Sequence, residues 1–240
     1  MLRYNELKTK PREFLASTGL KPDEFKQLLP AFRAAYEKKY PPELTQEGTP
    51  RQRQCGGGAK GALPEIEDKL FFILVYQKTN PLQTMQGLQF GMSQPQANCW
   101  IHRLLLVLQH ALRDLGEAPE RAASRVAGSP LALAGGPNLQ VDGTERRRQR
   151  PKDDAQQKEH YSGKKKAHTD KNILVVNANT KKVVYLSPTV PGKTHDKKAT
   201  DAAQVAYPTN ATLDKDTGFQ GYEPEATLTT QPKKSPEAKS

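Results

Sequence analysis

Apolar positions recur along the chain with two different periods, and the change between them falls near residue 138. Before this point, apolar residues follow the three- and four-residue spacing of amphipathic helices. This spacing predicts two short helices over residues 13–40 and three more between 64 and 115. After it, β-branched runs predict four short strands, at 139–142, 173–177, 182–186 and 211–214. We therefore expect a mixed α/β chain with an all-α N-terminal part.

Two of the three helices near the middle of the chain have clear start signals. Asn80 precedes a proline and fits a helix start, because asparagine caps helices and proline suits the first turn. After a turn at Gly91, Ser93 caps a longer helix that ends near Gly116. A short helix, a glycine turn and a longer helix are typical of a helix-turn-helix. A three-helix bundle with a polar outer face is the alternative on this pattern alone.

The second helix of a helix-turn-helix lies in the major groove, where its first residues meet base edges. Glutamine and asparagine suit paired hydrogen bonds with adenine. The candidates for reading DNA are therefore Ser93, Gln94, Gln96, Asn98 and Arg103.

The charge of the chain supports a nucleic-acid partner. The formal net charge is +11 and the isoelectric point about 9.6, which favours a polyanion over the alternative of a merely soluble basic protein. One basic run follows the strand expected at 139–142, and a second basic run precedes the strand expected at 173–177. Alone, each run is typical of a solvated surface, but together they suggest phosphate contacts. Their members are Arg146, Arg147, Arg148, Arg150 and Lys152, then Lys164, Lys165 and Lys166.

Several other classes of site are disfavoured. Cys55 and Cys99 show no zinc spacing and are expected to be free thiols. The glycine-rich run at 55–61 lacks the spacing of a phosphate-binding loop and is interpreted as a flexible linker. The N-terminus lacks the apolar region of a signal peptide, and no run is long enough to span a membrane. We expect a soluble intracellular protein with no membrane partner.

Two aspartates follow predicted strands. Asp142 ends the first strand and Asp216 follows the last one. If these strands are parallel neighbours, both carboxylates project from one end of the sheet and can hold two magnesium or manganese ions for phosphoryl transfer. Asp214 is a second choice for the later acid, because the two-residue strand period puts it on the same face. On spacing alone, ordinary turn residues are the alternative.

Four segments in this order change that balance. They are Val141-Asp-Gly-Thr-Glu145, Tyr161-Ser-Gly-Lys-Lys-Lys-Ala-His-Thr169, Gly192-Lys-Thr-His-Asp196 and Asp216-Thr-Gly-Phe-Gln-Gly-Tyr222. Together they resemble the DDE superfamily of bacterial insertion-sequence transposases, over roughly residues 15–230. The resemblance implies a helix-turn-helix followed by a ribonuclease H-like endonuclease core.

The resemblance also implies roles for residues. Asp142 and Asp216 become the first and second catalytic, metal-binding carboxylates, and the Ser-Gly-Lys-Lys-Lys run starts the second strand and contacts DNA. His195 and Asp196 begin the helix before the second acid and are candidates to face the site. The implied partners are the double-stranded terminal repeats of an element and further copies of the chain. The implied setting is the bacterial cytoplasm, in association with the nucleoid.

The expected domains follow from these patterns. They are a helical arm and basic linker (1–63), a helix-turn-helix domain (64–115), a linker (116–137), a partial ribonuclease H-like endonuclease (138–230) and a disordered tail (231–240).

The chain departs from the family at its third acid, a glutamate on a helix some tens of residues beyond the second aspartate. Glu223, Glu225 and Glu237 come too early and lie in no helical pattern. On this interpretation the chain stops before its last acid, and catalysis by it alone is largely lost unless another chain supplies the glutamate. One alternative is a truncated transposase that only binds DNA and represses transposition. The other is a basic scaffold with accidental motifs.

Overall fold

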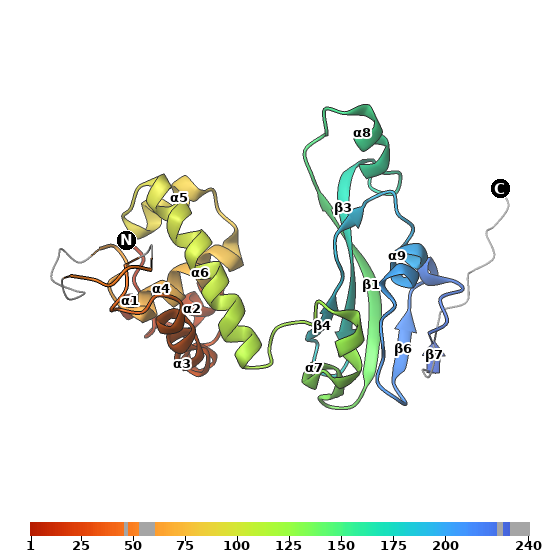
Figure 1. Ribbon diagram of the computed structural model, residues 1–240, viewed down its shortest axis with the longest axis horizontal. Coiled ribbons are helices and arrows are strands. Elements are labelled where there is room, and N and C mark those ends of the chain that lie inside the picture. Colours follow the sequence, from red (N-terminus) through yellow and green to blue (C-terminus); the bar gives the residue numbers. More distant parts are fainter. Residues whose placement is uncertain (46–47, 53–60, 225–227, 231–240) are drawn as a thin grey trace. The chain divides into compact units, whose positions relative to one another are not determined.

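A computed structural model describes residues 1–45, 48–52, 61–224 and 228–230 of the chain (Figure 1). It divides into two compact units, Met1–Glu117 and Ala118–Ser240. The first is helical, and the second is built on a sheet. Most of the glycine-rich run at 55–61 and the whole tail at 231–240 lie outside the described residues.

Helices form the first unit, as the apolar period predicts. Its described residues contain α1 (Tyr4–Leu7), α2 (Pro11–Thr18), α3 (Pro22–Lys39), α4 (Ile66–Thr79), α5 (Gln83–Phe90) and α6 (Gln94–Asp114). The five helices predicted between residues 13 and 115 correspond to α2 through α6.

An aromatic cluster joins the N-terminal helices to the helix-turn-helix. The ring centroid of Phe14 on α2 lies 5.4 Å from that of Phe25 on α3 and 5.8 Å from that of Phe71 on α4. All three side chains are fully buried in one core. The division expected at residue 63 therefore does not separate two packing units, because large aromatic side chains from both sides of it share one interior.

The helix ends agree with the sequence at one position and differ at another. At the start of α6, Gln96 N donates to Ser93 Oγ (3.4 Å) and Ser93 N donates to Gln96 Oε1 (3.0 Å), so the predicted cap is confirmed. Asn80, in contrast, is the last residue of the α4 turn, with φ +43°, and Leu82 precedes α5. Asparagine tolerates the left-handed conformation that commonly ends a helix, and its side chain also caps helix starts. The residue type alone therefore does not say whether Asn80 ends α4 or begins α5.

The second unit contains a mixed sheet with flanking helices. Its elements are η1 (Ala123–Gly128), α7 (Pro130–Leu133), β1 (Asn138–Arg147), α8 (Asp154–His160), β2 (Tyr161–Ser162), β3 (Ala167–Asn177), β4 (Val183–Leu186), β5 (Val190–Pro191), α9 (Asp196–Ala203), β6 (Thr212–Lys215), η2 (Thr217–Phe219) and β7 (Leu228–Thr230). The strand order is β2-β3-β1-β6-β7, with β4 and β5 also paired to β3. β3 is antiparallel to β1 and β4, whereas β6 is parallel to β1 and β7. This arrangement fits a ribonuclease H-like core, and the predicted fold class is confirmed.

The two faces of this sheet differ. Leu139 and Val141 on β1 point into the core together with Leu213 on β6. Val126 of η1 and Leu131 of α7 join the same core, so the segment expected to be a linker at 116–137 packs as part of the second unit. The alternate residues of β1 and β6 point to the opposite, more exposed face.

β1 is longer than predicted and forms an arm with β3. It continues past Asp142 to Arg147, and Arg147 pairs with Thr169 on β3. Arg146 and Arg147 therefore lie within the strand and do not follow it. α8 and β2 close the end of the arm. The three lysines at 164–166 lie in the turn before β3, whereas the resemblance implies that they start the strand.

The shared aromatic core predicts the effect of one substitution in α2. Phe14→Ala should destabilise the first unit by about 3–5 kcal/mol, because it leaves a cavity among buried rings. Urea unfolding followed by the fluorescence of Trp100, the only tryptophan and packed against this core, measures the loss. Leu15→Ala, at a 42 % exposed position of the same helix, is the control and should change little. Equal stability of the two variants would contradict a shared core.

Candidate functional site

Asp142 and Asp216 lie at the end of the parallel ladder between β1 and β6, although β1 itself continues to Arg147; Figure 1 shows the two strands. The pairing of β1 with β6 places Val141 opposite Lys215, and the two aspartates come one position later on their strands. Residues opposite each other in a parallel pair point to the same face. Val141 and Lys215 are buried, so the alternation turns both aspartates to the opposite, exposed face.

An open cleft of about 560 Å³ lies over this strand end. Its lining consists of Gln140, Val141, Asp142, Asp214, Lys215, Asp216 and Thr230. Asp214 pairs with Gln140 one step further back, and the Thr230 hydroxyl on β7 donates to Asp214 Oδ1. The structure thus brings Asp214 to the same face as the other two acids.

The backbone orients both aspartates in the same way. Gly143 N donates to Asp142 Oδ1 (2.7 Å), and Thr217 N donates to Asp216 Oδ1 (2.6 Å). Asp216 also caps the short helix η2, and its Oδ1 accepts a hydrogen bond from the Thr217 hydroxyl (3.3 Å). Each carboxylate is thereby fixed at its strand end by the next residue.

The oxygen donors at this cleft suit a hard divalent cation, because carboxylates are the ligands that magnesium and manganese prefer. Within residues 1–45, 48–52, 61–224 and 228–230, no three His, Cys, Asp or Glu side chains are grouped closely enough to hold an ion. The next acid, Glu223, accepts hydrogen bonds from Lys215 Nζ and Thr229 Oγ1, both at 3.0 Å. Glu225 and Glu237 lie outside the described residues.

His195 and Asp196 do not line the cleft. His195 is exposed and precedes α9, where its Nδ1 accepts a hydrogen bond from Lys197 N (3.3 Å). The Asp196 carboxylate lies against Gly143, on the face opposite to the Asp142 side chain. The Asp196 carboxylate thus lies on the face of the sheet that α9 covers, and a role of the pair at the site stays a prediction.

The sequence interpretation missed a buried charged cluster on that face. Lys171 Nζ lies 2.7 Å from Asp196 Oδ1 and 3.4 Å from Glu145 Oε1. Lys171 is 5 % exposed, although it stands in the polar run Asp170-Lys-Asn172, just before the β-branched run predicted as a strand. Charged residues in such a run are usually placed on the solvent side. No pattern in the sequence marked Lys171 as buried, because it precedes the predicted strand at 173–177 and becomes part of a strand only in the longer β3.

The polar start of α6 is organised by a residue of α5. Gln83 Oε1 accepts hydrogen bonds from Gln94 Nε2 (2.7 Å) and Asn98 Nδ2 (3.0 Å). Ser93 and Gln96 hold each other in the helix cap. Four of the five residues predicted to read DNA thus lie together, and Gln83 was not foreseen because it lies on the preceding helix.

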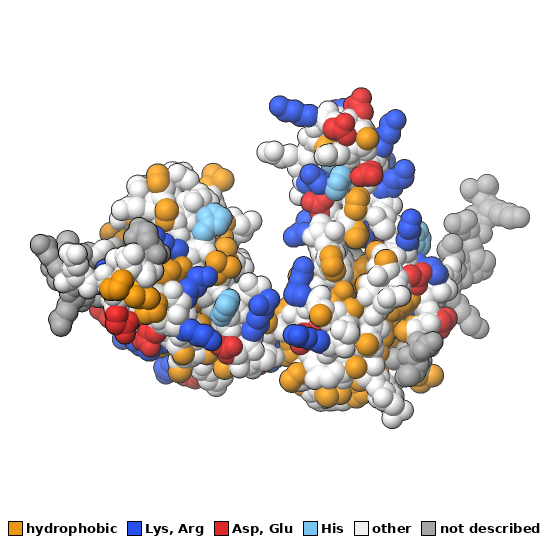
Figure 2. All heavy atoms as spheres, viewed as in Figure 1, with side chains coloured by type: hydrophobic (Ala, Val, Ile, Leu, Met, Phe, Trp, Pro, Cys, Tyr) orange, Lys and Arg blue, Asp and Glu red, His pale blue; other side chains and the backbone are white. Residues whose placement is uncertain are grey.

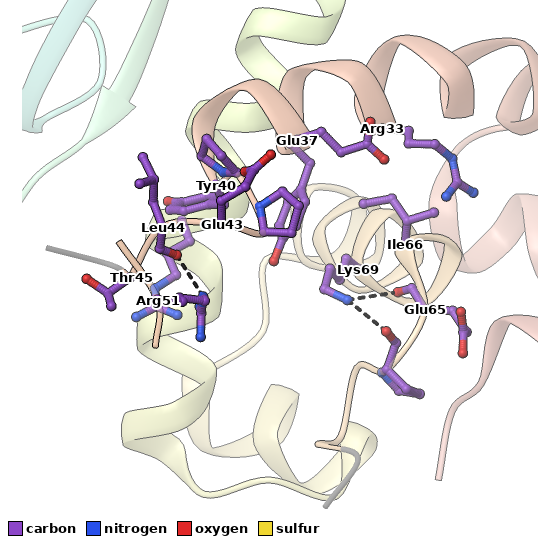
Figure 3. A pocket seen from close by; sticks show the side chains of 15 residues that line it. Arg33, Glu37, Tyr40, Glu43, Leu44, Thr45, Arg51, Glu65, Ile66 and Lys69 are labelled. Carbon is purple, nitrogen blue, oxygen red and sulfur yellow. Dashed lines mark hydrogen bonds between the residues drawn. The ribbon is translucent and has the colours of Figure 1, made fainter. Parts of the chain in front are cut away.

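The fifth residue, Arg103, lies elsewhere. Nine residues separate it from Gln94, which puts it about half a turn around the α-helix. Its guanidinium lies over the Trp100 ring, 5.8 Å from the ring centroid, and it lines a different hollow of about 650 Å³ (Figure 3). In that hollow Lys69 Nζ donates to the carbonyl oxygens of Pro64 (3.0 Å) and Glu65 (3.3 Å).

Basic side chains gather around α8 at the end of the second unit, with acidic ones among them (Figure 2). Some are already engaged. Arg146 Nη2 donates to Asn172 Oδ1 (2.8 Å), and Arg148 Nη1 lies 3.0 Å from Asp170 Oδ1. Lys164, Lys165 and Lys166 are exposed in the turn before β3. The predicted phosphate contacts therefore divide into arginines held within the arm and lysines directed to solvent.

The buried cluster predicts a pH dependence. Burial raises the pKa of Glu145, but hydrogen bonds from Ser162 and Thr169 and the Lys171 charge outweigh it and lower the pKa below its ordinary 4.5. A lowered pKa stabilises the fold above the unfolded-state value, and this gain is lost as pH falls through the folded-state value. The stability difference between wild type and Glu145→Gln, measured by calorimetry, should be constant above pH 5 and shrink below about 4.5. The exposed control Glu159→Gln should show no such trend.

Comparison with known families identifies both halves of the chain. Residues 61–114 match the helix-turn-helix of DDE superfamily endonuclease, and residues 141–239 match the DDE superfamily endonuclease domain. No curated protein and no solved structure matched the chain. In the described part of the chain, no helix has the length and apolar character needed to cross a membrane.

The first match covers α4 through α6, and the second begins one residue before Asp142 and includes Asp216. A helix-turn-helix and a nuclease domain of the same superfamily follow one another in one chain, as in transposase-type DNA-binding nucleases. The chain belongs to the DDE superfamily of endonucleases and is a DDE-type transposase.

Proposed function

We propose that the chain binds the ends of an insertion sequence and cuts and joins DNA at the cleft between β1 and β6, with Asp142 and Asp216 as metal-binding catalytic residues. The observation that carries this proposal is the register of the two parallel strands, which brings two carboxylates to one exposed end of their ladder. Asp214 is the third acid on this face, and the Thr230 hydroxyl already engages it.

The chemistry of the donors supports magnesium or manganese as the cofactor. Two such ions, when bound, activate the attacking hydroxyl and stabilise the leaving oxygen of a phosphoryl transfer. The protein's part is to fix the orientation of its carboxylates, and the hydrogen bonds from Gly143 N and Thr217 N do this. The open cleft of about 560 Å³ leaves room for a nucleic-acid backbone.

DNA binding is assigned to two surfaces, each within its own unit. The start of α6, with Gln94 and Asn98, reads bases in the major groove. The lysine turn before β3 contacts phosphates, because its side chains are exposed. Such contacts position the protein on DNA but do not distinguish one base sequence from another. We further propose that the chain acts as a homo-oligomer on DNA, as the resemblance to the family implies.

The first test removes one metal-binding carboxylate. Asp142→Asn keeps the size of the side chain and should reduce metal-dependent cleavage of terminal-repeat DNA at least a hundredfold, because phosphoryl transfer relies on electrostatic stabilisation. Cleavage is measured with Mg²⁺ and Mn²⁺ in gel assays. Asp201→Asn, an exposed acid on α9, is the matched control and should keep full activity.

The design also separates a nuclease from a DNA-binding protein. The assay is run with the chain alone and with a version extended at the C-terminus to supply a third acidic ligand. Cleavage that survives Asp142→Asn in either version would refute the assignment of the site. Specific binding without cleavage in both versions would favour the alternative, a transposase relative that represses transposition by occupying element ends.

A second test concerns the lysine turn. Lys164→Ala with Lys165→Ala should weaken binding to all duplexes alike and lower the slope of log K against log salt by about two, since two phosphate contacts are lost. Lys166 is left in place because its φ of +48° makes any substitution there ambiguous. Lys38→Ala with Lys39→Ala, at the end of α3, is the control with the same charge change. Binding isotherms at several salt concentrations give the slopes, and equal slopes for both double variants would exclude the turn as a phosphate contact.

A further inference from the structure

Three glycines of the motif segments surround the buried charged cluster behind the candidate site. A Cβ atom on Gly143 would lie 2.8 Å from Asp196 Oδ1, and one on Gly218 would lie 3.1 Å from Asp196 Oδ2. A Cβ on Gly192 would lie 1.9 Å from Thr169 Oγ1. Cβ contacts as short as those at Gly143 and Gly192 are essentially absent from proteins, and the one at Gly218 is unusually tight, so each glycine leaves space that the cluster occupies.

The two glycines that touch Asp196 follow the two candidate catalytic acids. Gly143 comes directly after Asp142, and Gly218 comes two residues after Asp216. One carboxylate therefore packs against the backbone of both strand ends, each oxygen against a different one. The N-terminus of α9 thus lies directly behind the cleft, on the other face of the sheet.

The Asp196 carboxylate is itself held in place. Lys171 Nζ, from the middle of β3, lies 2.7 Å from Asp196 Oδ1 and donates to Thr194 O (2.7 Å). The same ammonium lies 3.4 Å from Glu145 Oε1 on β1, and the Thr169 hydroxyl donates to Glu145 Oε2 (3.0 Å). A buried ammonium between two carboxylates is stable only when its geometry is well satisfied, which makes the cluster rigid.

We propose that Asp196 is a positioning residue for the catalytic cleft, which sets the spacing of the Asp142 and Asp216 strand ends from behind. This inference rests on the proposed function of those two acids. Asp196 touches no reacting group. It acts through the glycine backbones and through Lys171, which ties β3 and the start of α9 to β1.

The effect on metal binding follows from how carboxylates share an ion. Gly143 N anchors Asp142, and residue 217, just before Gly218, anchors Asp216. A shift of either backbone segment would carry an anchoring N–H with it and turn the carboxylate away. Groups that support metal ligands in this way typically contribute ten- to a hundredfold in metal affinity.

The test compares Asp196→Asn with Asp201→Asn in the full chain. Both remove one negative charge from α9, but Asp201 is exposed and pairs only with Lys197 at its surface (2.6 Å) among the contacts described for it. Hydrogen exchange followed by mass spectrometry, without metal or DNA, reports the backbone around residues 143 and 218. Asp196→Asn should speed exchange in both segments about tenfold, because the Lys171–Asp196 ion pair is lost, and Asp201→Asn in neither.

A second readout is the affinity for Mn²⁺, measured by the electron paramagnetic resonance of the free ion. Asp196→Asn should weaken it about tenfold or more, measured under conditions in which circular dichroism shows the variant to be folded. If Asp196→Asn leaves both exchange and Mn²⁺ affinity as in the wild type, the positioning role is refuted. If exchange speeds in only one segment, Asp196 does not couple the two strand ends, and the proposal is likewise overturned.

Two further variants keep the result interpretable. Should Asp196→Asn fail to fold, Gly218→Ala replaces it, because its Cβ needs a shift of only a few tenths of an ångström and should loosen the same two segments more weakly. Asp142→Asn tests the proposed function separately. If it binds Mn²⁺ as well as the wild type, the metal site is misassigned, while the exchange result still decides whether Asp196 holds the strand ends.

Discussion

The parallel pairing of β1 with β6 is the interaction on which the second unit depends. Parallel neighbours need a crossover, and here the chain passes through β3, β4 and α9 before it returns beside β1. The crossover covers one face of the sheet with α9 and leaves the other face open. The register of this pair places Asp142 and Asp216 together, and the register of β1 with β3, which pairs Glu145 with Lys171, sets the buried cluster behind them.

Periodicity predicted most of the fold. The change from helical to extended spacing near residue 138 separates the elements of the two units, and the pairing of Leu174 with Leu186 confirms the predicted hairpin. Strand lengths were not predicted, because Arg146 and Arg147 read as a basic loop while hydrogen bonding to β3 keeps them extended. A local residue pattern cannot reveal a strand segment that is extended only because it pairs with a neighbouring strand.

For the candidate site, the sequence indicated which residues to consider, but not the face of the sheet to which each side chain points. Asp142 and Asp216 could be named from their segments, and the shared face of Asp214 from the two-residue period, but their roles stay predictions. The orientation of Asp196 could not be foreseen, since it depends on which face of the sheet α9 covers. The contacts of Lys171 and Gln83 could not be foreseen either, because their partners are distant in sequence. Lys171 pairs with Asp196 and Glu145. Gln83 accepts hydrogen bonds from Gln94 and Asn98.

The length of β1 has a consequence for how the proposed site meets its substrate. Asp142 and Arg146 stand four residues apart on one strand and on one face, which separates them by about 13 Å at the rise of an extended chain. About the same length spans four nucleotides along one DNA strand. Because Arg146 also donates hydrogen bonds to Asn172 and Thr189, β1 would keep a fixed distance between the proposed catalytic site and this cation. The distance from the cut to the nearest held phosphate would then be a property of one strand, independent of how the helical unit is placed.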